Sequence, residues 1–264
     1  MIEVRDFHKA YDETPAVAGL TFTVQPGEIM GLVGPNGAGK TTTLRALSGI
    51  IPPTQGNLSV DGHDLEKDGV AAKRALAYVP DDPNLFEPLT VWEHLQFIAK
   101  AYEVDGLEEK GMALLEQFEL ADRRDTLAQE LSRGMRQKVA ICCAYLHEPK
   151  ALLLDEPLTG LDPRGIRTMK DSVTERAQNG TAVVVSSHML ELVEDLCSHL
   201  LIIHRGKQLY SGPIAGVRAA FADLSGDATL EEVFFHATEG PNGAPVKDAA
   251  GTDTSAPDAS APDA

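Results

Sequence analysis

The stretch GPNGAGKT, Gly34 to Thr41, decides how the rest of the chain is interpreted. It follows the apolar run Ile29–Val33, precedes a helix-like pattern at Thr42–Gly49, and fits G-x-x-x-x-G-K-[ST]. Glycines in such a loop let backbone N–H groups turn inward around a phosphate, and a helix beginning near Lys40 points its positive dipole end at the same anion. Lys40 can reach the β- and γ-phosphates, and the Thr41 hydroxyl can ligate Mg²⁺. The stretch therefore predicts a phosphate-binding loop (P-loop) for a nucleoside triphosphate.

Composition limits the classes of protein that could carry this loop. The chain has 264 residues, of which 43% are hydrophobic and 5% aromatic, as expected for a globular α/β protein. No apolar run approaches the ~18 residues that span a bilayer, and the charged start MIEVRD predicts no secretory signal. The cysteines Cys142, Cys143 and Cys197 have no metal-binding spacing, so reduced thiols are expected. The formal charge of −17 argues against a nucleic-acid partner, and any membrane role must come through another protein.

The order of the predicted elements favours an α/β fold. Alternating residues predict strands at Ile2–Phe7 and Leu20–Val24, with Tyr11 in the loop between them. Tight turns near these strands favour antiparallel pairing, whereas later strands alternate with helices such as Arg164–Gln178 and favour a mainly parallel sheet covered on both faces. Further strands are expected at Gly56–Val60 and Leu76–Val79, and the strands that alternate with helices are expected at Ala151–Leu154, Ala182–Ser186, Leu200–His204 and Gln208–Tyr210. The fold class predicted is a P-loop NTPase core with an N-terminal antiparallel β subdomain.

Two further segments interrupt or follow this core. Val91, Leu95 and Ile98 fall at helical spacing, and similar patterns continue to Leu146, which predicts a helical subdomain inserted at about residues 86–146. One folded domain is expected over residues 1–237, closed by the apolar helical stripe Leu230–Phe235. Residues 238–264 consist almost entirely of small and acidic residues, which cannot bury enough apolar surface to offset ordering entropy. A disordered acidic tail is predicted there.

The stretch ALLLDEP, Ala151 to Pro157, is an apolar strand that ends in two carboxylates. Asp155 at the strand end is placed to hold Mg²⁺, usually through water, and Glu156 is a candidate general base for the attacking water. The plainer alternative is a solvated strand end, but the neighbouring P-loop favours the metal-binding interpretation.

Two weaker motifs add to the site. In LSRGM, Leu131 to Met135, Ser132 is a plausible helix N-cap and Gly134 lets the backbone approach an anion, although an ordinary capped helix would look the same. His188 follows a predicted strand and the pair Ser186-Ser187. A lone histidine is usually a surface or packing residue, and here it could instead contact a γ-phosphate.

Seven motifs, taken in order, resemble the nucleotide-binding subunit of ATP-binding-cassette (ABC) transporters over about residues 2–237. They are Tyr11, GPNGAGKT, the turn at residues 80–83, LSRGM, LLLDEP, LTGLDP and SSH. The resemblance implies that Tyr11 stacks on adenine and that the phosphates are held by Asn36, Gly37, Ala38, Gly39, Lys40, Thr41 and Thr42. It also implies a head-to-tail dimer with a second copy or a similar ATPase subunit, in which the γ-phosphate bound by one copy is contacted by Ser132, Gly134 and Met135 of the other. Asp162 would cross that interface. Glu156, His188 and Lys40 would be catalytic, with His188 as the switch histidine.

The chain departs from the family pattern at two positions. Asp81 stands where the family usually has Gln; its carboxylate can ligate Mg²⁺ beside Thr41 and Asp155, but it adds negative charge near the γ-phosphate. We therefore expect weaker ATP binding without Mg²⁺. Arg133 replaces the usual Gly of the signature motif. Because a non-glycine residue at positive φ costs on the order of 1 kcal/mol or more, an ordinary φ is predicted for Arg133.

Short motifs narrow the resemblance to one branch. The stretches SRGMRQK, PDDP and TLEEVFF resemble exporters whose membrane subunit is a separate protein of about six spanning helices. This implies an ATP- and Mg²⁺-dependent hydrolase that is cytoplasmic, peripheral on the inner face of the cell membrane, and drives export. The alternatives are a non-transport cassette of the translation or iron–sulfur type, an importer subunit, and a DNA-repair ATPase, which would need a long coiled coil.

Overall fold

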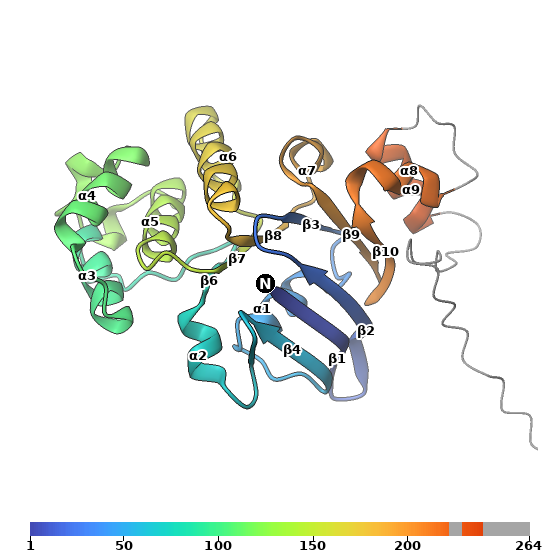
Figure 1. Ribbon diagram of the computed structural model, residues 1–264. Helices are drawn as coiled ribbons and strands as arrows, with labels where there is room; N and C mark the ends of the chain where they lie inside the picture. The colour runs from blue at the N-terminus through green and yellow to red at the C-terminus, as the bar shows by residue number, and fades with distance from the viewer. Residues whose placement is uncertain (222–228, 240–264) are drawn as a thin grey trace, which may run out of the picture.

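The strand that leads into the P-loop, β3 (Ile29–Val33), lies inside a six-stranded sheet of order β10-β9-β3-β8-β7-β6 (Figure 1). The computed structural model describes residues 1–221 and 229–239. Every strand pair in this sheet is parallel except β10 with β9, and β3, β7 and β8 are buried along their whole length, as expected for strands covered on both faces. The other strands are β6 (Leu76–Val79), β7 (Ala151–Asp155), β8 (Ala182–Ser186), β9 (His199–His204) and β10 (Lys207–Pro213).

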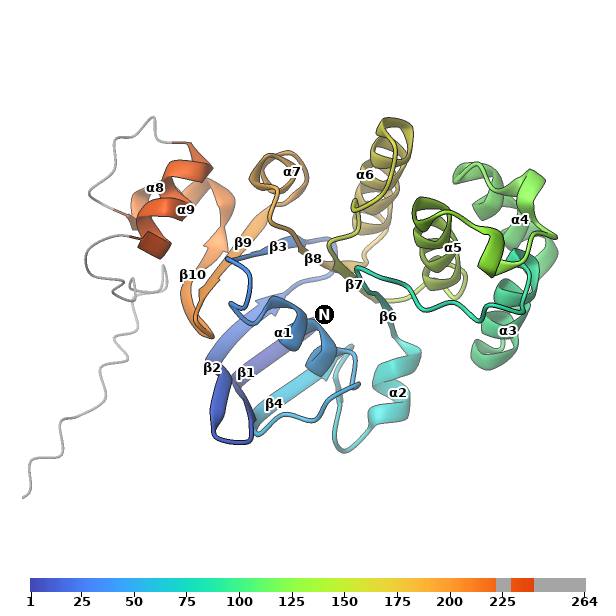
Figure 2. The same cartoon turned by 180° about the vertical axis from the view of Figure 1, so that it is seen from behind.

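A second, antiparallel sheet of order β2-β1-β4-β5 covers one face of the first. Figure 2 shows helix α1 (Lys40–Leu47), which follows the P-loop, lying between the two sheets. Alternate residues of the central strands pack into this layer, for example Leu32 and Leu153 against Val4 of the antiparallel sheet. The antiparallel strands are β1 (Ile2–Tyr11), β2 (Thr14–Val24), β4 (Gln55–Val60) and β5 (His63–Asp64).

Helices cover the opposite face of the six-stranded sheet and stand at both of its ends (Figure 1). The intervening strand residues, such as Leu152 and Val183, pack with Met169 and Val193 of the covering helices α6 (Pro163–Gln178) and α7 (Leu190–Leu196). Between β6 and β7 the chain forms α3 (Val91–Tyr102), α4 (Leu107–Gln117), α5 (Arg133–Tyr145) and the short helices η1 (Ala121–Arg123) and η2 (Ala128–Glu130). The remaining helices are α2 (Gly69–Arg74), η3 (Ile214–Gly216), α8 (Val217–Ala220) and α9 (Leu230–Glu239).

The α/β fold with a mainly parallel sheet, an N-terminal antiparallel sheet and inserted helices is confirmed, but the first two strands are longer than predicted. Tyr11 is the last residue of β1, so the prediction that it lies in the loop between the first two strands is wrong. Asp6 adopts φ +49° and the pairing of β1 with β2 shifts register between Val4 and Phe7. A bulge of this kind interrupts the alternation of inward and outward side chains, which is the signal that sequence reasoning follows.

The C-terminal boundary also differs slightly. Helix α9 continues to Glu239, past the predicted end of the folded domain at residue 237. The tail predicted to be disordered, residues 238–264, otherwise lies outside the described residues. Within the two described segments, no helix combines the length and apolar character needed to cross a membrane.

Candidate functional site

The P-loop needs glycine at positions where a side chain would collide with the backbone or strain it. A Cβ on Gly34 would lie 2.3 Å from the carbonyl oxygen of Ile203, and Gly39 has φ +109° with a Cβ position 2.9 Å from the carbonyl oxygen of Ala16. Gly39 is the N-cap of α1 and has no side chain to bond the first N–H groups of that helix. Those N–H groups are therefore available to an anion, as the sequence predicts.

Lys40 supplies a buried positive charge beside this loop. The residue is only 8% exposed, and Nζ donates hydrogen bonds to the carbonyl oxygens of Gly34 at 2.7 Å and Pro35 at 3.3 Å. Burial lowers the pKa of Lys40, and the nearby carboxylates of Glu156 and Asp155 oppose that shift. Among the described residues, the hydrogen bonds of this ammonium go to neutral carbonyl groups, which a phosphate can replace with a stronger, charge-assisted partner.

A pocket of about 270 Å³ joins the P-loop to three carboxylates. Asp155 is the last residue of β7, Glu156 follows it, and Asp81 comes shortly after β6. All three therefore meet the loop at the carboxyl edge of the sheet, where ligands of such sheets bind. The rest of the lining comes from Ala16, Pro35, Asn36, Gly37, Ala38, Gly39, Lys40, Thr41 and Thr42. Tyr11 is not in this lining. It is 48% exposed at the end of β1, with Lys9 Nζ 5.2 Å from its ring centre.

Asp155 is oriented by two hydroxyl groups that sequence reasoning did not single out. The carboxylate is 3% exposed; Ser186 Oγ donates to Oδ1, and the Tyr78 hydroxyl donates to Oδ2 at 3.4 Å. Burial, and then the charge of Asp155, raises the pKa of Tyr78 to about 12, so this hydroxyl remains a donor at neutral pH. Each carboxylate oxygen keeps acceptor capacity for a hydrated cation, so the donor set suits Mg²⁺.

Glu156 and His188 are in direct contact. Glu156 adopts φ +47°, a left-handed conformation, and its backbone N–H donates to the carbonyl oxygen of Ser186 at 3.1 Å. One carboxylate oxygen, Oε2, accepts a hydrogen bond from His188 Nδ1 at 2.8 Å and a longer one from the His188 backbone N–H at 3.4 Å. The Glu156 side chain is 18% exposed and that of His188 is 66% exposed, so the imidazole is the more accessible partner.

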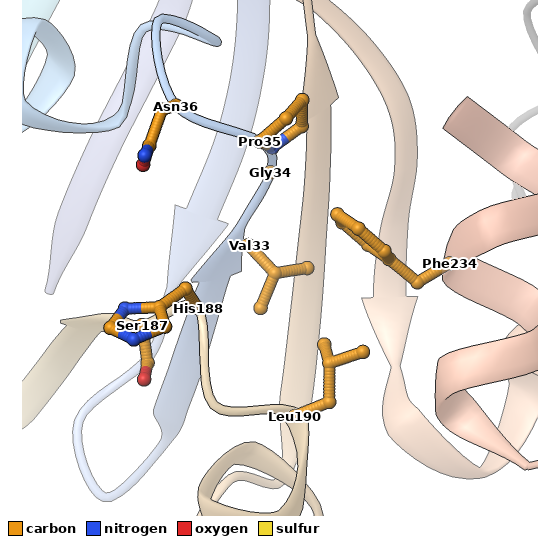
Figure 3. A pocket seen from close by; sticks show the side chains of 8 residues that line it. All are labelled: Val33, Gly34, Pro35, Asn36, Ser187, His188, Leu190 and Phe234. Carbon is orange, nitrogen blue, oxygen red and sulfur yellow. The ribbon is translucent and has the colours of Figure 1, made fainter. Parts of the chain in front are cut away.

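A second pocket, of about 310 Å³, lies on the other side of His188 and the start of the P-loop (Figure 3). Phe234 of α9 forms the wall opposite His188, with Pro35 and Asn36 at one end and Leu190 at the other. The sequence indicated an apolar stripe at residues 230–235 but gave no sign that this stripe reaches the P-loop. The pairing of such distant segments is a tertiary feature that local patterns do not carry.

The signature residues lie apart from the P-loop pocket, at the start of α5. Ser132 caps this helix as predicted, because Oγ accepts a hydrogen bond from the Met135 N–H at 3.3 Å. Gly134 approaches the loop after Glu156 so closely that a Cβ would lie 2.3 Å from the carbonyl oxygen of Gly160. Arg133, the first residue of α5, does not have a positive φ, which confirms that prediction.

Asp162 caps α6, where Oδ1 accepts from the Gly165 N–H at 3.1 Å, and it also lies 3.8 Å from Lys138 Nζ. Ser132, Gly134, Met135 and Asp162 are absent from the lining of the P-loop pocket. A single subunit therefore does not bring them to the P-loop.

Sequence reasoning also missed a turn that braces the P-loop. Gly206, between β9 and β10, donates its N–H to the carbonyl oxygen of Ala38 at 3.0 Å and accepts from the Ala18 N–H at 2.8 Å. Its φ is +76°, and a Cβ would lie 2.7 Å from the carbonyl oxygen of Ala16. The only sequence signal was the dipeptide Arg205-Gly206 between two strands, which indicates a turn but not its neighbours.

Comparison with known proteins identifies the family to which this chain belongs. Residues 17–159 match the family model described as ABC transporter. The chain belongs to the ABC transporter family. It is the ATP-binding subunit of such a transporter.

Individual relatives and structures agree with this assignment. The ABC subunit is 33% identical over 241 residues to the ABC-type transporter ATP-binding protein EcsA of Bacillus subtilis, covering 90% of this chain and 97% of the relative. It is 36% identical over 213 residues to the Nod factor export ATP-binding protein I of Burkholderia thailandensis, covering 80% and 70%. A solved structure of the ATP binding subunit of an ABC transporter superposes with a TM-score of 0.85 at 35% identity, covering 89% of this chain and 98% of that one.

Proposed function

We propose that this ABC subunit hydrolyses ATP with Glu156 as general base and drives export through a separate membrane subunit. The observation that carries the proposal is the 2.8 Å contact between Glu156 Oε2 and His188 Nδ1 at the edge of the P-loop pocket. A general base must lie within hydrogen-bond reach of the proton it accepts and must be held in place. His188 holds Glu156, and its Nε2 is the ring nitrogen left for the γ-phosphate.

The remaining residues have distinct roles in this proposal. Lys40 exchanges its carbonyl partners for the β- and γ-phosphate oxygens, with the help of backbone N–H groups of residues 36–42. Thr41 and Asp155, with Asp81 at the rim, hold Mg²⁺, which when bound neutralises charge on the phosphate oxygens. Tyr11 stacks on adenine from its exposed place at the end of β1.

The site is completed by a second copy of the chain. Four of the predicted site residues are absent from the P-loop pocket of their own subunit. They are Ser132, Gly134 and Met135 at the start of α5 and Asp162 at the start of α6. A head-to-tail dimer places them against the γ-phosphate bound by the other copy, where the positive end of the α5 dipole attracts the anion. ATP then joins two subunits, and hydrolysis releases them.

Export at the inner face of the cell membrane is supported by the relatives. Proteins similar to this chain are named for Nod factor export, for linearmycin resistance and as a probable multidrug transporter. The surface that we assign to the membrane subunit is a groove of about 250 Å³ beside α3 and α5. Two aromatic side chains of this groove are largely exposed, Phe86 at 54% and Phe97 at 53%, and they contact each other edge to face. Exposed neighbouring aromatics are typical of partner-binding surfaces.

Substituting Phe97 with aspartate is expected to abolish stimulation of ATP hydrolysis by the membrane subunit, because a charge replaces an apolar contact at the centre of the interface. An adjacent reading frame with about six apolar spans identifies the subunit to co-express and reconstitute in vesicles. Basal hydrolysis by the purified variant should match that of the wild type. Phe235→Asp, at an aromatic residue of α9 that is 47% exposed and outside the groove, is the matched control and should retain stimulation. A non-transport cassette would show no stimulation in any variant.

A further inference from the structure

The two positions at which the chain departs from the family pattern are in contact with each other. Arg133 Nη2 lies 3.2 Å from Asp81 Oδ1, although the two residues are 52 positions apart in the chain. Asp81 follows β6 and lines the P-loop pocket, whereas Arg133 opens α5 and is not in that lining. The side chains are 47% and 48% exposed, so solvent screens the pair but leaves it accessible to nucleotide and metal.

The stem of Arg133 lies beside the loop that follows Glu156. Its Cγ and Cδ atoms lie 3.4 Å and 3.5 Å from the position that a Cβ on Gly160 would occupy, which is ordinary packing distance. The backbone of Gly134 in turn lies close against the carbonyl group of Gly160. The guanidinium therefore lies where α5, the 156–160 loop and Asp81 meet.

We propose that Arg133 is a positioning residue that holds the Asp81 carboxylate at the rim of the nucleotide pocket and offsets its charge, and so sets how strongly ATP binding depends on Mg²⁺. The proposal rests on the Mg²⁺–ATP role proposed above for this pocket. A carboxylate beside a triphosphate repels it unless a cation lies between them. Mg²⁺ can be that cation when present, and Arg133 is the cation that the chain itself supplies.

A double-mutant cycle tests this with Arg133→Gln, Asp81→Asn and the double variant, all made in a Glu156→Gln background so that ATP is not consumed. The readout is the dissociation constant of ATP by calorimetry, in EDTA and then in excess Mg²⁺. In EDTA and low salt, Arg133→Gln is expected to weaken ATP binding about 2- to 5-fold, the range of an exposed ion pair. The same change in the Asp81→Asn background should have no effect. Excess Mg²⁺ or 0.5 M salt should reduce the loss of ATP affinity that Arg133→Gln causes.

Arg74→Gln is the matched control, because Arg74 forms a similar exposed pair with Glu103 at 3.3 Å away from the pocket, and it should leave ATP binding unchanged. Equal thermal unfolding midpoints show that each variant is folded. Additive effects of the two substitutions on ATP affinity would overturn the role of Arg133 even if ATP binds normally. Absence of ATP binding in the parent protein would instead overturn the proposed function.

Discussion

Substituting Glu156 with glutamine is expected to lower the rate of ATP hydrolysis by roughly 10²- to 10⁴-fold, the usual contribution of a general base. Glutamine has nearly the same shape and keeps an oxygen that can accept the hydrogen bond from His188 Nδ1, which spans 2.8 Å in the native chain. The change therefore removes the proton acceptor and leaves the P-loop, Lys40 and Asp155 in place. Phosphate release measures the rate, and calorimetry in Mg²⁺ should show ATP affinity within a few fold of the wild type.

The matched control for this substitution is Glu103→Gln, which alters an exposed carboxylate at the end of α3 that is outside the pocket lining. Hydrolysis by the control should equal that of the wild type. A rate for Glu156→Gln within about threefold of the wild type would rule out Glu156 as the base.

Substituting Lys40 with methionine is expected to have opposite effects on nucleotide binding and on fold stability. A charge-assisted hydrogen bond contributes about 1.5–3 kcal/mol, so losing the ammonium should weaken ATP binding roughly 10- to 150-fold. In the nucleotide-free chain Lys40 is 8% exposed, and its pKa is lowered, chiefly by burial. Replacing it with an apolar side chain removes that desolvation cost, so the free energy of unfolding should be unchanged or slightly higher.

The pH dependence of ATP binding follows from the lowered pKa of Lys40. Because the pKa of Lys40 lies below 10.5 in the folded, nucleotide-free chain, raising the pH neutralises the side chain earlier than it would an exposed lysine. ATP binds the charged form, so wild-type affinity should fall as the pH rises towards this lowered pKa, with uptake of a proton on binding. Lys40→Met should not show this fall, and Lys100→Met, at an exposed position of α3, should behave as the wild type. Equal pH profiles for wild type and Lys40→Met would contradict the role of Lys40.

Local patterns predicted most of the fold and one half of the site. The apolar runs that form β3, β7 and β8 are buried on both faces, and each is followed by residues that the site uses. Their chemistry was recognisable because glycine, lysine and acidic residues follow strand ends at short range. The register of β1 was not recognisable, because the left-handed Asp6 interrupts its alternation.

Contacts between distant segments could not be read in the same way. Tyr78 and Ser186 donate hydrogen bonds to Asp155 from neighbouring strands, and their roles depend on sheet order. The pairing of Arg133 with Asp81 was equally hidden, although both residues stood out as departures from the family pattern. The fold brings the two departures into contact at 3.2 Å.

We propose that a single ABC subunit holds half of the catalytic arrangement, and that a second copy supplies the rest through the start of α5. The most direct test is the molar mass of the Glu156→Gln variant in solution, measured by light scattering with and without Mg²⁺–ATP. We predict a monomer without nucleotide and a dimer holding one ATP per chain with it. Adding Ser132→Arg, which places a bulky side chain at the N-cap of α5, should leave ATP bound to a monomer. A Glu156→Gln chain that is saturated with ATP and still monomeric would contradict the account.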